Sequence, residues 1–592
     1  MSPSRRLQGA SPEARVQTTC PSCDPAGDWD LEAPEPARWC GQHVSSGGRK
    51  RKRISVSVVT GRKPLGGHGD PPPPDASRLR RALRRSAKPL LAAGCGALPV
   101  LIFPAPGWWW FAYVCLVPLL LVLRGAATPR KALQLGWFGG MGFLIGVMSW
   151  LIPLLSVFIV AIAALLGLIW APWGWLVHRL LHGTPDVGRV VAALVLVPTG
   201  WLVTETVRSW QYLGGPWGLL GASQYQQHIA LRLASVGGVW LDSLLIVAVN
   251  TAVVALIVSW GRSYAAWLTL VSLALGAVAV SAWAPQPKLT GSSAAVGVVQ
   301  PGLAVDSTGY RTTRGEQLTA MLTEAHPDLV LWGESSVADD LTVHPEVTAK
   351  LAALSRATGA DLLVNVDAVR PGSGGIYKSS VLVGPDGLTG QRYDKIRLVP
   401  FGEYIPLRPV LGFVADFSKA AAVDRRRGTT PVVMTVPTPG GGTLKVGPLI
   451  CFESAFPDMS RALEQRGAQV ILVQSATSTF QGTWAPEQHA SLAAFRAAES
   501  GRSVVQATLT GVSVAYDPSG RQVGTELGKS ASAAEVYTVP LATGDTLYDR
   551  WGNWVPTGSV LVLLLWGGAW YVAGRRGAKR ASQAENQGSA ES

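Results

Sequence analysis

The pattern of apolar and polar positions divides the chain into regions with different expected structures. Between residues 88 and 283 the sequence is a series of seven apolar runs, each near the roughly 17 to 25 residues that cross a bilayer as a helix. They cover residues 88–104, 108–124, 132–151, 153–177, 189–207, 236–259 and 264–283, and an eighth run covers 557–574. We therefore predict a membrane domain of seven transmembrane helices at 88–283 and an eighth transmembrane helix at 557–574.

Residues 284–556 show a different pattern, in which short β-rich runs alternate with amphipathic stretches. The candidate strands are 296–299, 329–332, 362–366, 380–383, 445–450, 470–474 and 504–508, and the candidate helices are 314–325, 345–357 and 486–501. Such alternation, punctuated by Pro-Asp-Gly and Pro-Ser-Gly turns, predicts an α/β domain in which helices cover sheets.

The amino-terminal residues 1–87 are rich in Pro, Gly, Ser and Arg, a composition typical of disordered segments. Cys20, Cys23, Cys40 and His43 have spacings within the range of a zinc ribbon. Few hydrophobic residues surround them to build a core around a metal, so we predict no metal site and no cofactor. Residues 575–592 form a second polar tail.

Composition and charge distribution favour a membrane protein over a nucleic-acid-binding protein. Hydrophobic residues make up 48 % of the chain and charged residues 15 %, which is too apolar for an ordinary soluble enzyme. Of the net charge of +14, residues 1–88 contribute 17 Lys/Arg against 8 Asp/Glu, next to the first apolar run. The alternate loops between the runs carry Arg124, Arg130, Lys131, Arg179, Arg189 and Arg262. The positive-inside rule then predicts that both tails are cytoplasmic and that 284–556 lies on the outer face, although Arg208 and Arg232 in an outward loop depart from the pattern.

Three polar residues after apolar runs of the 284–556 region are candidates for chemistry: Glu334, Lys395 and Cys451. A cysteine at a strand end is most often a small buried hydrophobe, and Cys451 has no other cysteine in its region for a disulfide. A carboxylate can take the thiol proton and return it to a leaving group, and an ammonium can lower the thiol pKa and hold an oxyanion. Their combination indicates nucleophilic catalysis by Cys451.

Glu205 is a further ionisable residue, close to the end of a predicted span. A charged group at membrane depth indicates a functional site. The alternative is a structural pair with Arg208, three residues along the helix, and the sequence leaves both open.

Four motifs make the chain resemble the nitrilase superfamily and, within it, the apolipoprotein N-acyltransferases. They are Gly-x-Pro-Trp-x-x-x-Gly-x-Ser-Gln at 214–224, Trp-Gly-Glu-Ser at 332–335, Tyr-Asp-Lys-Ile-Arg-Leu-Val-Pro-Phe-Gly-Glu-Tyr-Ile-Pro at 393–406 and Cys-Phe-Glu-Ser at 451–454. The order Glu, Lys, Cys after seven spans and before one more extends the resemblance over residues 88–574.

The resemblance implies an αββα nitrilase-like domain that moves an acyl chain from a phospholipid, through a thioester, to the α-amine of a lipoprotein's diacylglyceryl-cysteine in the bacterial plasma membrane. It makes Cys451 the nucleophile, Glu334 the general base and acid, and Lys395 the oxyanion partner. Glu403 would orient Lys395 and the substrate amine, and Glu453 with Phe452 would line the site. Trp217, Gln224, Phe401 and Tyr404 are the implied substrate-binding residues.

The chain departs from the family pattern at three places. Phe452 stands where a Tyr is common, Ser-Ala-Thr-Ser-Thr-Phe at 475–480 replaces a Ser-Asn-Asp-Ala-Trp-Phe run, and Gln506 stands where an Arg is frequent. These departures concern the positioning of the substrate and leave the three catalytic positions intact.

The lipid anchors of the expected donor and acceptor explain why the chain would have a membrane domain. Each buried methylene contributes roughly 0.8 kcal/mol to membrane anchoring, so a two-chain donor and a lipid-anchored acceptor both stay in the bilayer. The two lipids would then use one site in turn, which predicts ping-pong kinetics. Two alternatives stay open: a membrane-tethered nitrilase or amidase that hydrolyses a small C–N substrate, and a membrane scaffold without catalytic activity.

Overall fold

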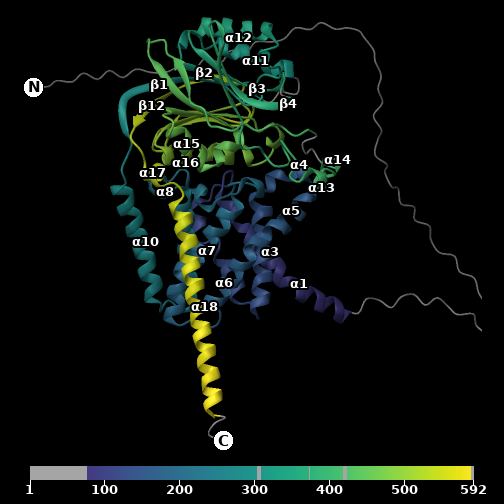
Figure 1. Cartoon of the computed structure of the whole chain (residues 1–592), viewed down its shortest axis with the longest axis vertical. Coiled ribbons are helices and arrows are strands. Elements are labelled where there is room, and N and C mark those ends of the chain that lie inside the picture. The colour runs from purple at the N-terminus through teal and green to yellow at the C-terminus, as the bar shows by residue number, and fades with distance from the viewer. Residues whose placement is uncertain (1–75, 303–307, 373, 418–422, 589–592) are drawn as a thin grey trace, which may run out of the picture. The chain divides into compact units, whose positions relative to one another are not determined.

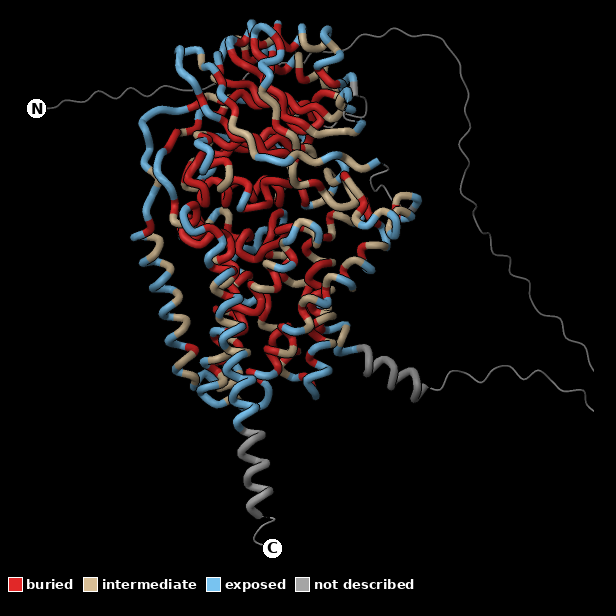
Figure 2. The backbone as a smooth tube through the Cα atoms, in the orientation of Figure 1, coloured by how far each residue is buried: buried red, intermediate tan, exposed pale blue. Residues whose placement is uncertain are grey.

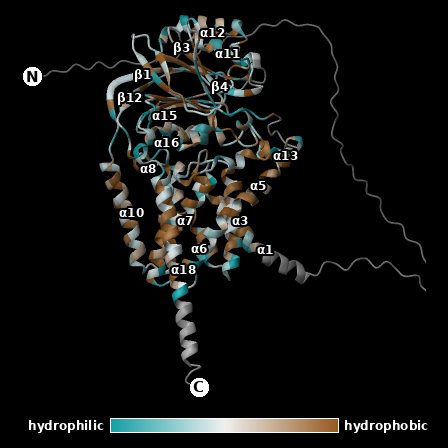
Figure 3. Cartoon of the chain, in the orientation of Figure 1, coloured by the Kyte–Doolittle hydropathy of each residue, from teal (hydrophilic) through white to brown (hydrophobic). Residues whose placement is uncertain are grey.

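The computed structural model describes residues 76–302, 308–372, 374–417 and 423–588, and these belong to one compact unit, Pro74–Ser592. A set of apolar helices and an α/β domain make up this unit (Figure 1). Hydrophobic residues dominate the helices that include α3, α5, α7 and α10 (Figure 3). The predicted tail with Cys20, Cys23, Cys40 and His43 lies outside the described residues.

Helices occupy every apolar run that the sequence pattern marked as a span. They are α1 (Ala76–Ala97) with η1 (Leu98–Ile102), η2 (Trp109–Tyr113) with α2 (Val117–Arg124), α3 (Pro129–Val147), α4 (Ile152–Leu155), α5 (Phe158–Gly167), α6 (Ala171–Leu181), α7 (Val187–Arg208), α9 (Val239–Val258), α10 (Tyr264–Trp283) and α18 (Trp554–Gly588). In the described part of the chain, five helices are long and apolar enough to cross a membrane, or six if α3 and the segment Ser149–Leu155, bent by 64°, form one broken span. The helices Ala87–Ile102 and Trp109–Arg124 are shorter, so the count of eight spans stays a prediction.

Glycines let α3 approach its neighbours closely. A Cβ on Gly142 would lie 1.9 Å from the Ala93 carbonyl oxygen of α1, and one on Gly136 would lie 2.9 Å from the Cα of Gly174 on α6. Small residues at such positions bring helix backbones into van der Waals contact, which is the main source of helix association in a membrane.

Two six-stranded mixed sheets form the α/β domain. The first has the order β12-β1-β2-β3-β4-β5 and the second β11-β10-β9-β8-β7-β6. The strands are β1 (Lys288–Gln300), β2 (Leu329–Trp332), β3 (Asp361–Arg370), β4 (Gly375–Gly384), β5 (Gly387–Asp394), β6 (Met434–Pro437), β7 (Thr443–Ile450), β8 (Val470–Ser475), β9 (Ser503–Thr508), β10 (Ser513–Tyr516), β11 (Gln522–Leu527) and β12 (Ala533–Thr543). In each sheet three neighbouring strands are parallel, β1-β2-β3 and β7-β8-β9.

Apolar layers hold the two sheets together and attach a helix pair to each outer face. Side chains such as Val298, Leu331 and Leu472 fill the space between the sheets, and α11 (Thr308–Ala320) and α12 (Pro345–Thr358) cover the first sheet. The second sheet carries α15 (Pro457–Glu464) and α16 (Ala485–Ser500), whose core continues into that of the membrane helices. The buried residues accordingly run from both sheets into the helices (Figure 2). This arrangement confirms the predicted αββα layers.

All seven predicted strands and three predicted helices are present, while β5, β6, β10, β11 and β12 were not predicted. The reason is visible in β11, whose residues are mostly exposed and lack an apolar run. An edge strand of this kind is stabilised by its hydrogen bonds to β10 and has little hydrophobic signal of its own.

Glu205 and Arg208 are both fully buried at the end of α7. The Glu205 carboxylate accepts a hydrogen bond from the Leu220 amide at 3.0 Å, and the Arg208 guanidinium donates to the Gly215 carbonyl at 3.0 Å. Each therefore bonds the backbone of the loop that follows α7, and this loop carries the Gly-x-Pro-Trp motif.

Shortening a side chain between the sheets tests this packing. We expect Leu472→Ala to lower the free energy of unfolding by about 2–5 kcal/mol because it removes buried methyl groups and leaves a cavity. Thermal unfolding of the detergent-solubilised full chain measures the effect, and Leu289→Ala, at a side chain that is 63 % exposed on β1, is the control. Equal melting temperatures for the two variants would contradict the intersheet core.

Candidate active site

Glu334 and Cys451 come from different sheets, at the carboxyl ends of β2 and β7. The sheets approach each other closely here, because the Glu334 amide donates to the Ser475 carbonyl of β8 at 3.0 Å. A Cβ on Gly333 would lie 2.1 Å from the Leu509 nitrogen, so only glycine fits directly before Glu334. The Trp-Gly-Glu motif is thereby explained by the packing of two backbones.

Lys395, which follows β5, joins two carboxylates in the interior. Its Nζ donates to Glu334 Oε1 at 2.9 Å and to Glu403 Oε1 at 2.8 Å, and its side chain is fully buried. Glu403 is itself fixed, because its Oε2 accepts the Val399 amide at 2.8 Å. The predicted residues Glu334, Lys395 and Glu403 thus form one hydrogen-bonded cluster.

Cys451 lies at a sharp turn between β7 and the short helix η8 (Cys451–Ala455), with φ of +51°. A non-glycine residue in the left-handed region is uncommon and strained, and it is held here by its surroundings. His489 of α16 donates from Nε2 to the Cys451 carbonyl oxygen at 3.0 Å. Glu453 accepts hydrogen bonds from the Ile450 amide at 2.8 Å and the Tyr393 hydroxyl at 2.7 Å, so it braces the turn.

The electrostatic environment separates the protonation states of the acid and the thiol. Burial opposes ionisation of Glu334, but the charges of Lys378 and Lys395 outweigh it and lower the pKa of Glu334 to about 2. Burial and the negative charge of Glu334 raise the pKa of Cys451 to about 12, against the opposing effect of Lys395. At neutral pH the site therefore holds a protonated thiol beside an ionised carboxylate, which is the arrangement that a general base requires.

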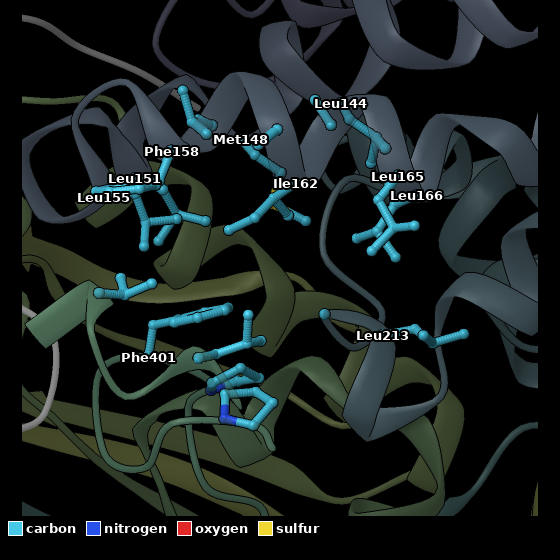
Figure 4. A pocket seen from close by; sticks show the side chains of 18 of the residues that line it. Leu144, Met148, Leu151, Leu155, Phe158, Ile162, Leu165, Leu166, Leu213 and Phe401 are labelled. Atoms are coloured by element: carbon cyan, nitrogen blue, oxygen red, sulfur yellow. The ribbon is translucent and has the colours of Figure 1, made fainter. Parts of the chain in front are cut away.

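An apolar cavity of about 420 Å³ lies between the membrane helices and the α/β domain. Leu144, Met148, Leu151, Phe158, Ile162 and Leu166 line it from the helices, and Leu213 and Phe401 lie on the other side (Figure 4). Phe452 also lines the cavity. Phe401 has φ of +63°, and its amide donates to the Tyr404 carbonyl at 2.7 Å. Because Phe452 directly follows Cys451, the cavity adjoins the Cys451 turn.

The other implied substrate-binding residues lie in different surroundings. Trp217 is buried, donates to Gln488 at 3.1 Å and stacks on the ring of His489, so it contacts the helix that holds the Cys451 turn. The guanidinium of Arg427 lies over the Tyr404 ring, with its central carbon 5.0 Å from the ring centroid. Gln224 is buried apart from the cluster and donates to the Trp109 carbonyl at 3.0 Å. Its contacts are those of a structural residue, and its substrate-binding role stays a prediction.

Two residues of the site were not predicted from the sequence, Lys378 and His489. Lys378 lies in the middle of β4 and His489 in the second turn of α16, and no recognised motif includes either residue. Only the position of His489 within a predicted amphipathic helix could have drawn attention to it. Among the described residues, no group of three or more His, Cys, Asp or Glu side chains could hold a metal ion.

Comparison with protein families assigns both parts of the chain. Residues 95–252 match the apolipoprotein N-acyltransferase N-terminal domain, and residues 324–543 match the carbon-nitrogen hydrolase domain. A relative from Gloeobacter violaceus, named apolipoprotein N-acyltransferase, is 31 % identical over 522 residues, covering 83 % of this chain and 96 % of the relative. The chain belongs to the apolipoprotein N-acyltransferase family.

The chain is also similar to other proteins. The apolipoprotein N-acyltransferase of Pseudomonas paraeruginosa is 30 % identical, and the match covers 81 % of this chain and 94 % of the relative. That of Geobacter metallireducens is 28 % identical, and the match covers 78 % of this chain and 91 % of the relative. Among solved structures, a mutant of the Nesterenkonia AN1 amidase from the nitrilase superfamily is similar to this chain at 21 % sequence identity and a TM-score of 0.31. The match covers 45 % of this chain and 97 % of the amidase chain. Membership of the apolipoprotein N-acyltransferase family confirms the predicted N-acyltransferase activity and nitrilase-like domain.

The raised pKa of the thiol predicts slow alkylation of Cys451 in the resting enzyme. Below pH 10 the thiolate fraction of a group with a pKa of about 12 rises about tenfold for each pH unit. We therefore expect the rate of labelling by iodoacetamide, followed on the Cys451 peptide by mass spectrometry, to rise without a plateau from pH 7 to 10. Cys451→Ala identifies the labelled peptide, and a plateau below pH 9 would show that the site stabilises the thiolate.

Proposed function

We propose that the enzyme transfers an acyl chain from a phospholipid to the α-amine of a lipoprotein's diacylglyceryl-cysteine, through a thioester on Cys451. The observation that carries this proposal is the apolar cavity of about 420 Å³ that is lined by Phe452, the residue after Cys451, and partly by membrane helices. A small polar amide would leave such a cavity empty, whereas an acyl chain buries its methylenes there.

In the first half-reaction, Cys451 Sγ attacks the ester carbonyl carbon of the donor while Glu334 accepts the thiol proton. Because the thiol has a pKa of about 12, proton transfer accompanies formation of the C–S bond instead of preceding it. The Lys395 ammonium stabilises the oxyanion that develops on the carbonyl oxygen. Collapse of the tetrahedral intermediate breaks the C–O bond, and the lysophospholipid leaves with the proton from Glu334.

In the second half-reaction the α-amine of the acceptor attacks the thioester carbonyl carbon. Glu334 takes a proton from the amine, the C–S bond breaks, and Glu334 passes that proton to the thiolate of Cys451 as the amide is released. Glu403 holds Lys395 from the second side at 2.8 Å, and we assign to it the orientation of Lys395 and of the incoming amine. The two lipids use one site in turn, which gives ping-pong kinetics.

We propose that the catalytic domain faces the outer side of the bacterial plasma membrane and that both tails are cytoplasmic. Support comes from two predicted cytoplasmic loops that meet. Arg124 at the end of α2 donates to the carbonyls of Leu181 and Gly183, and Arg189 on α7 donates to that of His182. These basic residues therefore gather at one end of the helices, as the positive-inside rule expects of a cytoplasmic end.

Trapping the thioester tests the nucleophile and the donor together. After incubation of the full chain with phospholipid in detergent micelles and no acceptor, we expect intact-mass measurement to find one acyl group added at Cys451. Cys451→Ala removes the adduct, and Glu334→Gln slows its formation at least about 100-fold because a general base contributes roughly that factor. Ammonia release from soluble amides without any lipid adduct would instead indicate the amidase alternative.

Narrowing the cavity tests the place of the acyl chain. Ile162 points into the cavity from α5 (Figure 4), so Ile162→Trp should lower kcat/KM about 10-fold for long-chain donors and leave short-chain donors nearly unchanged. Val160→Trp, at a side chain of α5 that is 48 % exposed and does not line the cavity, is the matched control. Equal losses for both chain lengths would exclude this cavity as the acyl site.

A further inference from the structure

A second lysine, Lys378, lies beside the catalytic cluster. It is in the middle of β4, directly opposite Asp367 of β3 in the antiparallel register, and its side chain is 11 % exposed. Its carbonyl accepts the Lys395 amide hydrogen bond at 2.9 Å. The sheet therefore fixes Lys378 and Lys395 as neighbours whose side chains enter the same buried space.

The ammonium of Lys378 contacts the same carboxylate oxygens as that of Lys395. Its Nζ is 3.1 Å from Glu334 Oε1 and 3.6 Å from Glu403 Oε1, and it donates to Ser335 Oγ at 2.9 Å. Both lysines thus bind Oε1 of Glu334.

The charges of the whole group balance only when Lys378 is counted. The carboxylates are Glu334, Glu403 and Asp367, which lies 3.5 Å from Lys378, and the cations are Lys378, Lys395 and Arg425, which lies 3.3 Å from Asp367. Buried charges of this kind are stable only as compensated sets. Without Lys378 the group would carry an excess negative charge, with Lys395 as its one cation in contact with Glu334.

That arrangement conflicts with the role of Lys395 in the proposed reaction. Lys395 must turn part of its hydrogen bonding toward the developing oxyanion, which weakens its hold on Glu334 at the moment when that carboxylate takes the thiol proton. A fixed second cation removes the conflict, because it stays on Glu334 throughout the reaction.

We propose that Lys378 is a positioning residue that keeps Glu334 ionised and oriented as the general base, so that Lys395 is available to the oxyanion. This inference rests on the proposed role of Glu334. The other ionisable groups around Glu334 are Glu403, Asp367, Arg425, Cys451 and His489, and Arg311 of α11 donates to the neighbouring Ser335 carbonyl at 2.9 Å. Lys378 and Lys395 both lower the pKa of Glu334 through their charge and through a hydrogen bond, and the charge of Lys378 has the larger electrostatic effect of the two.

The test is the pH dependence of thioester formation in a single turnover, measured by intact mass on the full chain with phospholipid micelles and no acceptor amine. Removing the cation raises the pKa of the base, so activity is lost at a higher pH as the solution is acidified. The acid limb is the pH range in which the rate of thioester formation falls on acidification. We expect the acid limb of Lys378→Met to lie about 1–3 pH units higher than that of the native chain, since a neighbouring opposite charge shifts the pKa of a carboxyl by this amount. Lys378→Arg keeps the charge and should restore the native limb.

Matched variants separate an electrostatic role from a structural one. Lys529→Met removes a lysine that pairs with Glu487 at 2.8 Å and should leave the limb unchanged. The double variant Asp367→Asn with Lys378→Met removes one charge of each sign, so it protects folding and should move the limb part of the way back. Melting temperatures of all variants verify that they are folded.

Three results would overturn this role of Lys378: native rates in Lys378→Met, an equal loss at every pH, or the same loss in Lys378→Arg. Retained thioester formation in Cys451→Ala or Glu334→Gln would instead overturn the proposed function. If these two variants are inactive and the acid limb of Lys378→Met is unchanged, the proposed role of Lys378 is overturned and the proposed function is retained.

Discussion

The site depends on one electrostatic constraint: a carboxylate and an ammonium that are removed from water must each have a partner within hydrogen-bond distance. Lys395 and Glu334 satisfy it at 2.9 Å, and Glu403 and Lys378 complete the set. The same contacts have a chemical consequence, because they hold the Glu334 carboxylate ionised while the Cys451 thiol stays protonated. Stability of the buried charges and readiness for proton transfer therefore come from the same hydrogen bonds.

Helix α16 connects this cluster to the membrane helices. Gln488 and His489 contact Trp217 of the loop after α7, and His489 also holds the carbonyl of Cys451. At the other end of α16, the Glu499 carboxylate accepts the Val239 amide at the start of α9. The Cys451 turn is thus braced by the same helix that rests on the membrane helices. The apolar cavity lined by both domains accordingly reaches Phe452, the residue after Cys451.

Much of the α/β domain could be predicted because its central strands are continuous apolar runs, as Leu329–Trp332 and Val470–Ser475 illustrate. The edge strand Gln522–Leu527 could not, because its stability comes from pairing and not from burial of its own side chains. Glu334, Lys395, Glu403 and Cys451 were predicted as a set, and the structure brings them together at the strand ends. The sequence signal at these positions is strong because each lies in a motif that constrains several neighbours at once.

The sequence by itself determined the apolar runs and the layered domain, and it singled out Glu334, Lys395 and Cys451 as candidates for a base, a cation and a nucleophile. These features are encoded locally, in hydrophobic periodicity and in short motifs. Only the tertiary structure decided which side chains become neighbours. It separated Gln224 from the cluster, added His489 behind the Cys451 turn, and placed Lys378 on Glu334. A lysine in the middle of a strand carries no local signal, because its surroundings depend on the register with β3 and on the opposing sheet.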